Sequence, residues 1–188
     1  MKQITIGRPY IREYGDVSRL EAIITGSNFE KIHYFEVQKQ YGQYLCYERS
    51  DAFVVSLFYF ALVNGYDMKC TVPMSEKLYY QLTRILMPTM VKYHSDFFHT
   101  IKITAKLDNV PIQNAKGVGA AVSGGVDSFY TIVTNMSTET KDFDITHLLV
   151  ANSYNIFHGD ENTRRRFRET ANHSQVIADD LGLPLIRM

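Results

Sequence analysis

A ten-residue stretch, AVSGGVDSFY from Ala121 to Tyr130, constrains the fold of this chain more than any other. Apolar residues from Val118 to Val122 predict a short buried strand, and the two glycines that follow allow a tight turn. Asp127 then begins a helical pattern. The order of strand, glycine loop and helix is typical of α/β proteins, in which helices connect parallel strands.

The same stretch has the chemistry of an anion site. Gly124 and Gly125 can adopt backbone angles closed to other residues, and they carry no side chain that would hold a phosphate away. The helix that begins near Asp127 adds unpaired N–H groups and the positive end of its dipole. Ser123 and Ser128 supply hydroxyl groups on either side. The stretch therefore predicts a phosphate-binding loop.

Six consecutive residues spell SGGVDS: Ser123, Gly124, Gly125, Val126, Asp127 and Ser128. This run resembles the SGGxDS signature of the N-type ATP pyrophosphatases, also called PP-loop enzymes. The strand before it and the helix after it are similar to the context of that signature. The Walker pattern GxxxxGK[ST] is absent. A glycine turn that spells the motif without binding phosphate is the alternative.

The resemblance implies a reaction. In such enzymes ATP adenylates a carboxylate or carbonyl oxygen, pyrophosphate leaves, and a nitrogen or sulfur nucleophile displaces AMP. We therefore expect an ATP-dependent adenylating synthetase or ligase that activates a small molecule for attack by a nitrogen nucleophile. A non-catalytic module that binds ATP or AMP, and a sulfur-transfer enzyme of the same superfamily, are the alternatives.

The resemblance also implies which residues bind ATP and Mg²⁺. The expected ATP contacts are the loop and the ends of the first two strands: Ala121, Val122, Ser123, Gly124, Gly125, Val126, Asp127, Ser128, Val150, Ala151 and Asn152. Ligands of open parallel sheets lie at the carboxyl ends of the strands, so the adenine is expected beside the strand-end members of this set. Asp127 is the expected Mg²⁺ ligand, because hard oxygen ligands beside phosphates hold this ion. Asp127 and Ser128 are the expected catalytic residues.

Strands and helices alternate after the boundary near residue 110, which predicts a parallel sheet with crossover helices. The expected strands are 118–122, 146–151 and 183–188, and the expected helices are about 127–136 and 162–181. The resemblance implies a Rossmann-like, PP-loop type of fold with about five strands. We therefore expect residues 111–188 to be the first half of an ATP-binding domain, and the chain to be a fragment of a longer protein.

Residues 1–110 predict a small α+β domain of unknown role. Alternating residues predict strands, the earlier ones in an antiparallel unit, at about 4–6, 20–24, 31–37, 43–47, 68–72 and 98–104. Helices are expected at 52–63, capped by Ser50 or Asp51, and from Ser75 onward. Pro88 is expected to stop the second helix or to kink its last turn.

Composition narrows the class of protein. Lys plus Arg and Asp plus Glu both total 20, so no net basic field attracts nucleic acid or an acidic membrane, although a local basic site is not excluded. No apolar run has the length of a membrane span, and the N-terminus lacks the apolar core of a signal peptide. We therefore expect a cytoplasmic protein whose partners are ATP and a small-molecule substrate, with a homodimer left open. Cys46 and Cys70, which lie far apart, are expected to be reduced thiols.

Four arginines occupy the first turns of the expected long helix, where the helix dipole disfavours cations: Arg164, Arg165, Arg166 and Arg168. Either an anion compensates their charge, or they form a solvated face in which Arg165 pairs with Glu169 four residues later.

Overall fold

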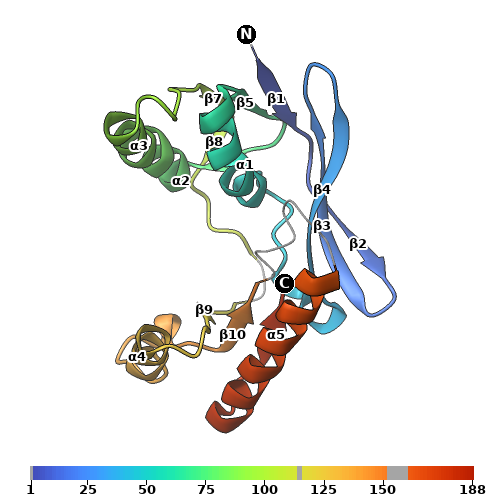
Figure 1. Ribbon diagram of the computed structural model, residues 1–188, viewed down its shortest axis with the longest axis vertical. Helices are drawn as coiled ribbons and strands as arrows, with labels where there is room; N and C mark the ends of the chain where they lie inside the picture. Colours follow the sequence, from blue (N-terminus) through green and yellow to red (C-terminus); the bar gives the residue numbers. More distant parts are fainter. Residues whose placement is uncertain (1, 114–115, 152–160) are drawn as a thin grey trace. The chain divides into compact units, whose positions relative to one another are not determined.

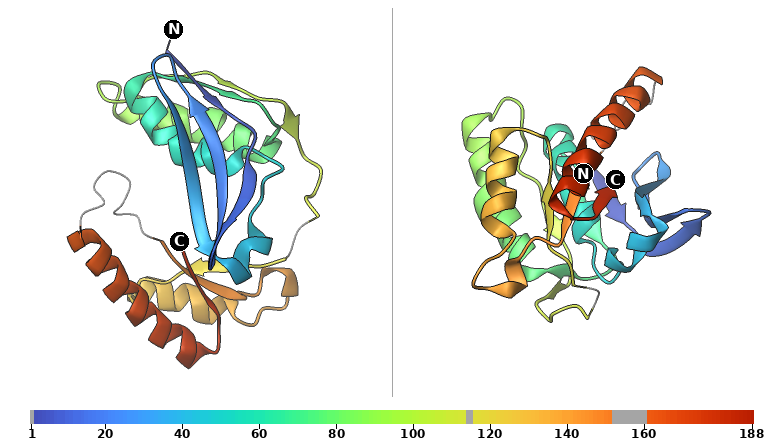
Figure 2. Two further views of the ribbon diagram at one scale, coloured as in Figure 1. Left: turned by 90° about the vertical axis from the view of Figure 1, so that its right-hand side faces the viewer. Right: turned by 90° about the horizontal axis from the view of Figure 1, so that it is seen from below.

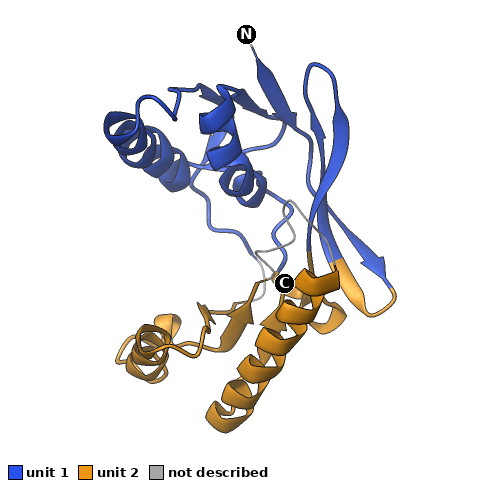
Figure 3. Cartoon of the chain, viewed as in Figure 1, with its two compact units in different colours: residues 1–14, 19–35, 45–114 blue, residues 15–18, 36–44, 115–188 orange. Residues whose placement is uncertain are grey.

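The computed structural model describes residues 2–113, 116–151 and 161–188 (Figure 1). They form two compact units, which Figure 3 distinguishes by colour. Unit 1 comprises Met1–Tyr14, Arg19–Phe35 and Leu45–Asn114. Unit 2 comprises Gly15–Ser18, Glu36–Tyr44 and Ala115–Met188. Two short segments from the first part of the chain therefore belong to the same unit as the glycine loop.

Unit 1 is built on a six-stranded mixed sheet with the order β2-β3-β1-β5-β7, in which β4 also pairs with β3. The strands are β1 (Gln3–Ile6), β2 (Tyr10–Tyr14), β3 (Val17–Thr25), β4 (Glu30–Gln38), β5 (Asp67–Cys70) and β7 (Ile103–Thr104). β1 is antiparallel to β3 but parallel to β5, and β5 is parallel to β7. The expectation of an antiparallel unit among the earlier strands is confirmed for β1 with β3. β5 and β7 extend the same sheet in parallel, because the chain returns to β5 through a helix rather than a hairpin turn.

The helical segments of unit 1 lie along one face of this sheet (Figures 1 and 2). They are α1 (Asp51–Asn64), α2 (Glu76–Tyr80), the π-helical η2 (Gln81–Leu86) and α3 (Met87–Tyr93). Phe53 and Leu62 of α1 are fully buried in one cluster with Ile4, Ile6 and Met68 of the strands. The short strands β6 (Met74–Ser75) and β8 (Leu107–Asp108) form a separate parallel pair.

Pro88 does not end its helix, so the first of its two predicted effects is wrong. α3 continues to Tyr93 with Pro88 in its first turn. The preceding η2 has the wider π turn, which ends with the N–H of Met87 donating to the carbonyl of Leu82. Proline in a regular helix clashes with the carbonyl four residues earlier, and the wider turn relieves that clash.

Two expected strands of unit 1 are absent or short. Residues 43–47 form no strand, and η1 (Lys39–Tyr44) is a 3₁₀ helix in which Gly42 packs so closely on Ser18 that a Cβ would lie 2.6 Å from its hydroxyl oxygen. In the expected strand 98–104 only β7 pairs. The preceding N–H groups bond elsewhere, His99 to the carbonyl of Leu62 at 2.8 Å and Lys102 to the carboxylate of Asp67 at 2.8 Å.

The expected cap of α1 also differs. Ser50 is the residue before the helix, but its hydroxyl donates to the carbonyl of Val72 at 3.3 Å and not to the helix. Asp51 accepts the N–H of Ser75 at 2.8 Å. Both side chains therefore tie the start of α1 to the chain after β5, in place of the local capping that the sequence predicts.

Unit 2 contains a three-stranded parallel sheet with the order β11-β10-β9. Its elements are β9 (Gly119–Ala121), α4 (Val126–Asn135), the 3₁₀ turn η3 (Lys141–Phe143), β10 (His147–Val150), α5 (Glu161–Leu181) and β11 (Leu185–Arg187). These elements confirm the predicted alternation of strand and helix. Ile132, Leu148 and Ala178 are fully buried in its core. Figure 2 shows β11 returning beside α5. No helix in the described part of the chain is long and apolar enough to cross a bilayer.

Candidate functional site

The glycine loop connects β9 to α4 at the carboxyl edge of the parallel sheet. β9 ends at Ala121, and the N–H of the buried Val122 still donates to the carbonyl of Leu149 on β10 at 3.0 Å. Ser123 and the four residues after it are exposed. The chain therefore leaves the sheet and enters solvent within a single residue.

The two glycines of the loop have different conformations. Gly124 has φ of 77°, in the left-handed region where a side chain is strained. Gly125 has φ of −87° and ψ of 164°, an extended conformation that any residue adopts. Of the two glycines, only Gly124 therefore uses backbone angles that are closed to other residues. A methyl group at Gly125 would project from the loop without contacting more than the hydroxyl of Ser123, at 3.6 Å.

From Gly124 to Ser128, four N–H groups have no acceptor among the described residues, namely those of Gly124, Val126, Asp127 and Ser128. The first backbone bond of α4 runs from the N–H of Phe129 to the carbonyl of Gly125 at 3.1 Å. The donors before it are left over by the geometry of a helix start. Several unpaired N–H groups beside the positive end of a helix dipole form a site for an anion.

Hydrogen bonds of the two serine hydroxyls fix the conformation of the loop. Ser128 donates to the carbonyl of Gly125 at 2.8 Å, and Ser123 donates to the hydroxyl oxygen of Ser128 at 3.3 Å. The N–H of Gly125 reaches the hydroxyl oxygen of Ser123 at 3.4 Å. Ser128 therefore supports the loop from within, while the exposed Ser123 remains accessible from solvent.

Asp127 is an exposed carboxylate in the first turn of α4. The described residues contain no cluster of three or more His, Cys, Asp or Glu that could hold a metal ion. Mg²⁺ is commonly held by one or two carboxylates together with substrate phosphates, and it keeps several waters. A lone carboxylate beside free N–H groups fits Mg²⁺ that arrives with a polyphosphate.

The strand-end residues are divided between the core and the surface. Val122 and Val150 are buried in the core of unit 2, so their side chains cannot reach a ligand. The carbonyl of Val150 already accepts the N–H of Met188 at 2.9 Å. Ala121 and Ala151 are exposed, and Asn152 lies outside the described residues. The structure therefore brings Ala121 and the loop residues together, and it places the side chains of Val122 and Val150 in the core of unit 2.

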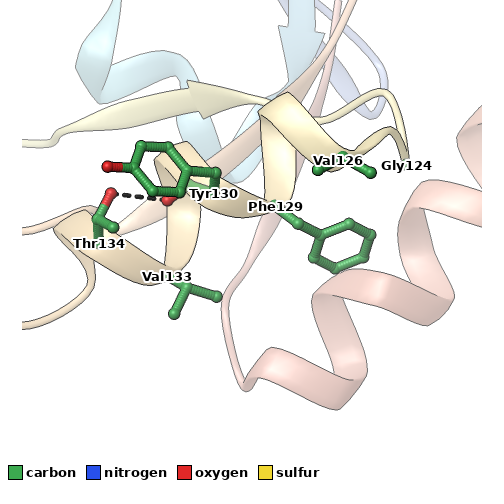
Figure 4. A pocket seen from close by; sticks show the side chains of 6 residues that line it. All are labelled: Gly124, Val126, Phe129, Tyr130, Val133 and Thr134. Atoms are coloured by element: carbon green, nitrogen blue, oxygen red, sulfur yellow. Dashed lines mark hydrogen bonds between the residues drawn. The ribbon is translucent and has the colours of Figure 1, made fainter.

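A first hollow of about 420 Å³ lies along the outer side of α4, and Figure 4 shows its six lining residues: Gly124, Val126, Phe129, Tyr130, Val133 and Thr134. The ring of Phe129 extends toward α5 in this view. Val126, Tyr130 and Val133 are 85%, 71% and 63% exposed. α4 therefore presents an apolar stripe to solvent, although its spacing of three and four residues in the sequence would indicate a core-facing side.

A second hollow of about 610 Å³ lies between α4 and the free edge of β9. It is lined by Val118, Gly119, Ala120, Ala121, Asp127, Ser128, Thr131, Asn135, Phe143 and Ile145. Polar residues of α4 face it, and two of them belong to the glycine loop. Sequence reasoning missed this hollow. The sequence does contain one sign of it: the polar residues Asp127, Thr131 and Asn135 recur every four residues and therefore lie on one side of α4.

Comparison of this chain with known proteins identifies no relative. No protein-family model, curated protein or solved structure matches this chain.

The structure also describes the two cysteines and the surroundings of two of the four arginines near the start of α5. Cys46 and Cys70 are free cysteines in unit 1, and burial raises the pKa of both thiols, which keeps them protonated at neutral pH. On α5, Arg165 lies 3.8 Å from Glu169, as expected. Arg168 donates to Glu161 at 2.8 Å, and this hydrogen bond lowers the pKa of the Glu161 carboxyl. These pairs favour the solvated-face interpretation for two of the four arginines.

Proposed function

We propose that the loop from Val122 to Ser128 binds the polyphosphate of ATP. The observation that carries the proposal is the group of four unpaired N–H donors at the start of α4. The left-handed Gly124 supports it, because a residue without a side chain lets a phosphate approach the backbone. The resemblance of SGGVDS to the PP-loop signature supports the same ligand. The parallel order β11-β10-β9 is compatible with a Rossmann-like fold of the PP-loop type.

We further propose that the protein is an adenylating synthetase or ligase. An oxygen of the acceptor attacks the α-phosphorus of ATP, and the bond from that phosphorus to pyrophosphate breaks. A nitrogen nucleophile then displaces AMP from the activated carbon. The protein supplies no nucleophile in this sequence, so its contribution is positioning and electrostatic stabilisation.

Each loop residue has a role in the proposal. The free N–H groups donate to phosphate oxygens, and the dipole of α4 favours the same negative charge. Ser128 keeps the loop in shape through its bond to the carbonyl of Gly125. Asp127 would share Mg²⁺ with the phosphate oxygens, and the ion would offset the charge that develops on the departing pyrophosphate.

Titration calorimetry with Mg·ATP tests the binding step, and the release of AMP and pyrophosphate in the presence of candidate acceptors and ammonia tests the reaction. We expect Asp127→Ala to lower Mg·ATP affinity at least about tenfold, the effect of losing one charge-assisted contact. Asp142→Ala is the control, since this exposed acid of η3 lies in the same unit, outside the glycine loop, and lines neither hollow. Tight binding without release would favour a non-catalytic module. No binding at millimolar Mg·ATP would refute the proposal.

A further inference from the structure

We propose that Tyr44 is a positioning residue for the glycine loop, and that the affinity of the loop for phosphate depends on its ring. This inference rests on the proposed function, because Mg·ATP affinity is one of its two readouts. Tyr44 comes from the segment 36–44, which belongs to unit 2 although it lies far before the loop in the sequence. The proposed ATP-binding unit therefore extends beyond residues 111–188, where the sequence predicts it.

This segment has a fixed place on the sheet of unit 2. Near its start, Oε1 of Gln38 accepts the N–H of Arg187 on β11 at 3.1 Å. Further on, Gly42 packs so closely on the buried Ser18 that a Cβ would lie 2.6 Å from the serine hydroxyl oxygen. These contacts fix the backbone of the segment, so Tyr44 at its end meets the sheet at a defined point.

The ring of Tyr44 lies against both Gly117 and His147. A Cβ on Gly117 would lie 2.9 Å from the ring carbon Cε1, too close for an unstrained contact. The same ring meets the imidazole of His147 on β10 edge to face, with centroids 4.8 Å apart. Tyr41 of the segment also contacts His147, at 5.9 Å between centroids. The residue just before Val118 therefore passes directly against Tyr44, and glycine leaves the room for that approach.

A second set of contacts joins the same ring to Val118 through side chains. The hydroxyl oxygen of Thr146 accepts the N–H of Val118 at 2.9 Å, and the hydroxyl donates to the carbonyl of Val118 at 3.2 Å. Nδ1 of His147 lies 2.8 Å from that hydroxyl oxygen. Because the single hydroxyl proton is already used, Nδ1–H of His147 is the donor. The contacts therefore run from Tyr44 through His147 and Thr146 to Val118.

The strand carries this position to the loop. β9 is only three residues long, Gly119–Ala121, and the loop begins two residues after it at Ser123. The N–H of Val122 is bonded to the carbonyl of Leu149 at 3.0 Å, so the strand is attached to β10 at both of its ends. A shift at Val118 is therefore passed to the loop. Hydrogen bonds weaken steeply with misalignment, and a displacement of about 1 Å is costly where several donors act on one ligand.

Calorimetry with Mg·ATP on the full chain tests the role of the ring. We expect Tyr44→Ala to weaken binding about fivefold, the scale of one lost aromatic contact. Tyr44→Phe should bind like the unmodified protein, since the Tyr44 hydroxyl has no hydrogen-bond partner among the residues that the structure describes. Tyr47→Ala is the matched control, because this tyrosine is exposed and belongs to unit 1. Unchanged affinity in Tyr44→Ala would overturn the inference.

A second control separates positioning from general destabilisation. Leu62 is fully buried in the core of unit 1, so Leu62→Ala should lower the urea midpoint at least as much as Tyr44→Ala. Affinity falls only by the fraction of unfolded protein, and Leu62→Ala should therefore bind Mg·ATP normally while it remains folded. An equal loss of affinity in Leu62→Ala would show that Tyr44 acts through stability alone, and would overturn the inference.

A double-mutant cycle tests the contact itself. Gly117→Ala places a methyl group against the ring of Tyr44, so we expect it to weaken Mg·ATP about fivefold as well. In the Tyr44→Ala background the ring is gone, and Gly117→Ala should then add nothing. Losses that simply add would contradict the contact between the two residues. Gly117→Ala also carries the test if Tyr44→Ala does not fold.

NMR without nucleotide distinguishes this inference from the proposed function. We expect Tyr44→Ala and Gly117→Ala to shift the amide resonances of Gly124 and Ser128, and Tyr44→Phe to leave them in place. If the unmodified chain does not bind Mg·ATP but these shifts occur, the proposed function fails and the positioning of the loop by Tyr44 stands. If the unmodified chain binds and neither variant moves the loop resonances, the inference alone fails.

Discussion

The hydroxyl of Ser128 donates a 2.8 Å hydrogen bond to the carbonyl of Gly125, three residues earlier. The same carbonyl accepts the N–H of Phe129 at 3.1 Å, the first backbone bond of α4. One carbonyl therefore secures both a side chain and the start of the helix. The N–H groups between these two bonds are held in place and remain free for a ligand.

We expect Ser128→Ala to weaken Mg·ATP about fivefold, because one intramolecular hydrogen bond contributes about 1 kcal/mol and its loss lets the loop depart from its binding geometry. Ser137→Ala, an exposed serine just after α4, is the matched control. Calorimetry on both variants measures the difference. Equal affinities would show that the bond from Ser128 to Gly125 does not shape the site.

Substitution by alanine should have different effects on stability at Gly124 and at Gly125. Gly124→Ala forces a side chain into the left-handed region and should lower the free energy of unfolding by about 1–2 kcal/mol. Gly125→Ala should keep or slightly raise stability, since its backbone is extended, while its methyl group obstructs the phosphate and lowers ATP affinity. Urea unfolding and calorimetry on both variants separate the effects. A stability loss at Gly125 as large as that at Gly124 would contradict this assignment.

Stability should fall in mild acid because of His33. Its imidazole lies against Phe35 and Phe53, with ring centroids 5.5 Å and 5.8 Å away, and burial lowers its pKa. The unfolded chain therefore takes up the proton first, near pH 6.5. The stability that the neutral His33 imidazole contributes is fully present above that pH, and it is lost as the pH falls through the lower pKa of the folded state. Urea unfolding between pH 7.5 and 5 should show the loss, and His33→Gln should flatten it. An unchanged slope in the variant would exclude His33 as the cause.

Neighbouring residues of α4 should differ sharply in their contribution to stability. Ile132 is fully buried, so Ile132→Ala should cost about 2–5 kcal/mol. Val133 is exposed, so Val133→Ala should change stability by less than about 0.5 kcal/mol. Thermal unfolding measures both. A large loss at Val133 would mean that the apolar stripe is covered in solution.

The contrast between these two positions shows what periodicity can and cannot predict. Val126, Phe129, Tyr130 and Val133 are spaced three and four residues apart, which puts them on one side of α4. The spacing does not state whether another element covers that side, because coverage depends on the tertiary arrangement. The parallel pairing of β1 with β5 escaped prediction for a similar reason, since the partners are separated by three strands, a 3₁₀ helix and an α-helix.

The candidate site was predictable to the extent that its chemistry is local. A glycine before a helix start predicted the left-handed Gly124 and the free donors, because both depend on a few adjacent residues. The sequence could not predict that Val122 and Val150 are buried while Ala121 is exposed. Neighbouring residues of a strand lie on opposite faces of the sheet, and the sequence does not specify which face is covered by other elements. The second hollow required the free edge of β9, which only the strand order reveals.

The segment 36–44 has a practical consequence for dissecting this chain. The ring of Tyr44 lies 4.8 Å from that of His147 on β10, and Gln38 accepts the N–H of Arg187 on β11 at 3.1 Å. A recombinant protein that starts at residue 111 would keep the glycine loop, but it would lose the contacts that Tyr44 and Gln38 make with β10 and β11. Truncation at that point should therefore yield a poorly soluble, protease-sensitive product, whereas the uncut chain retains these contacts.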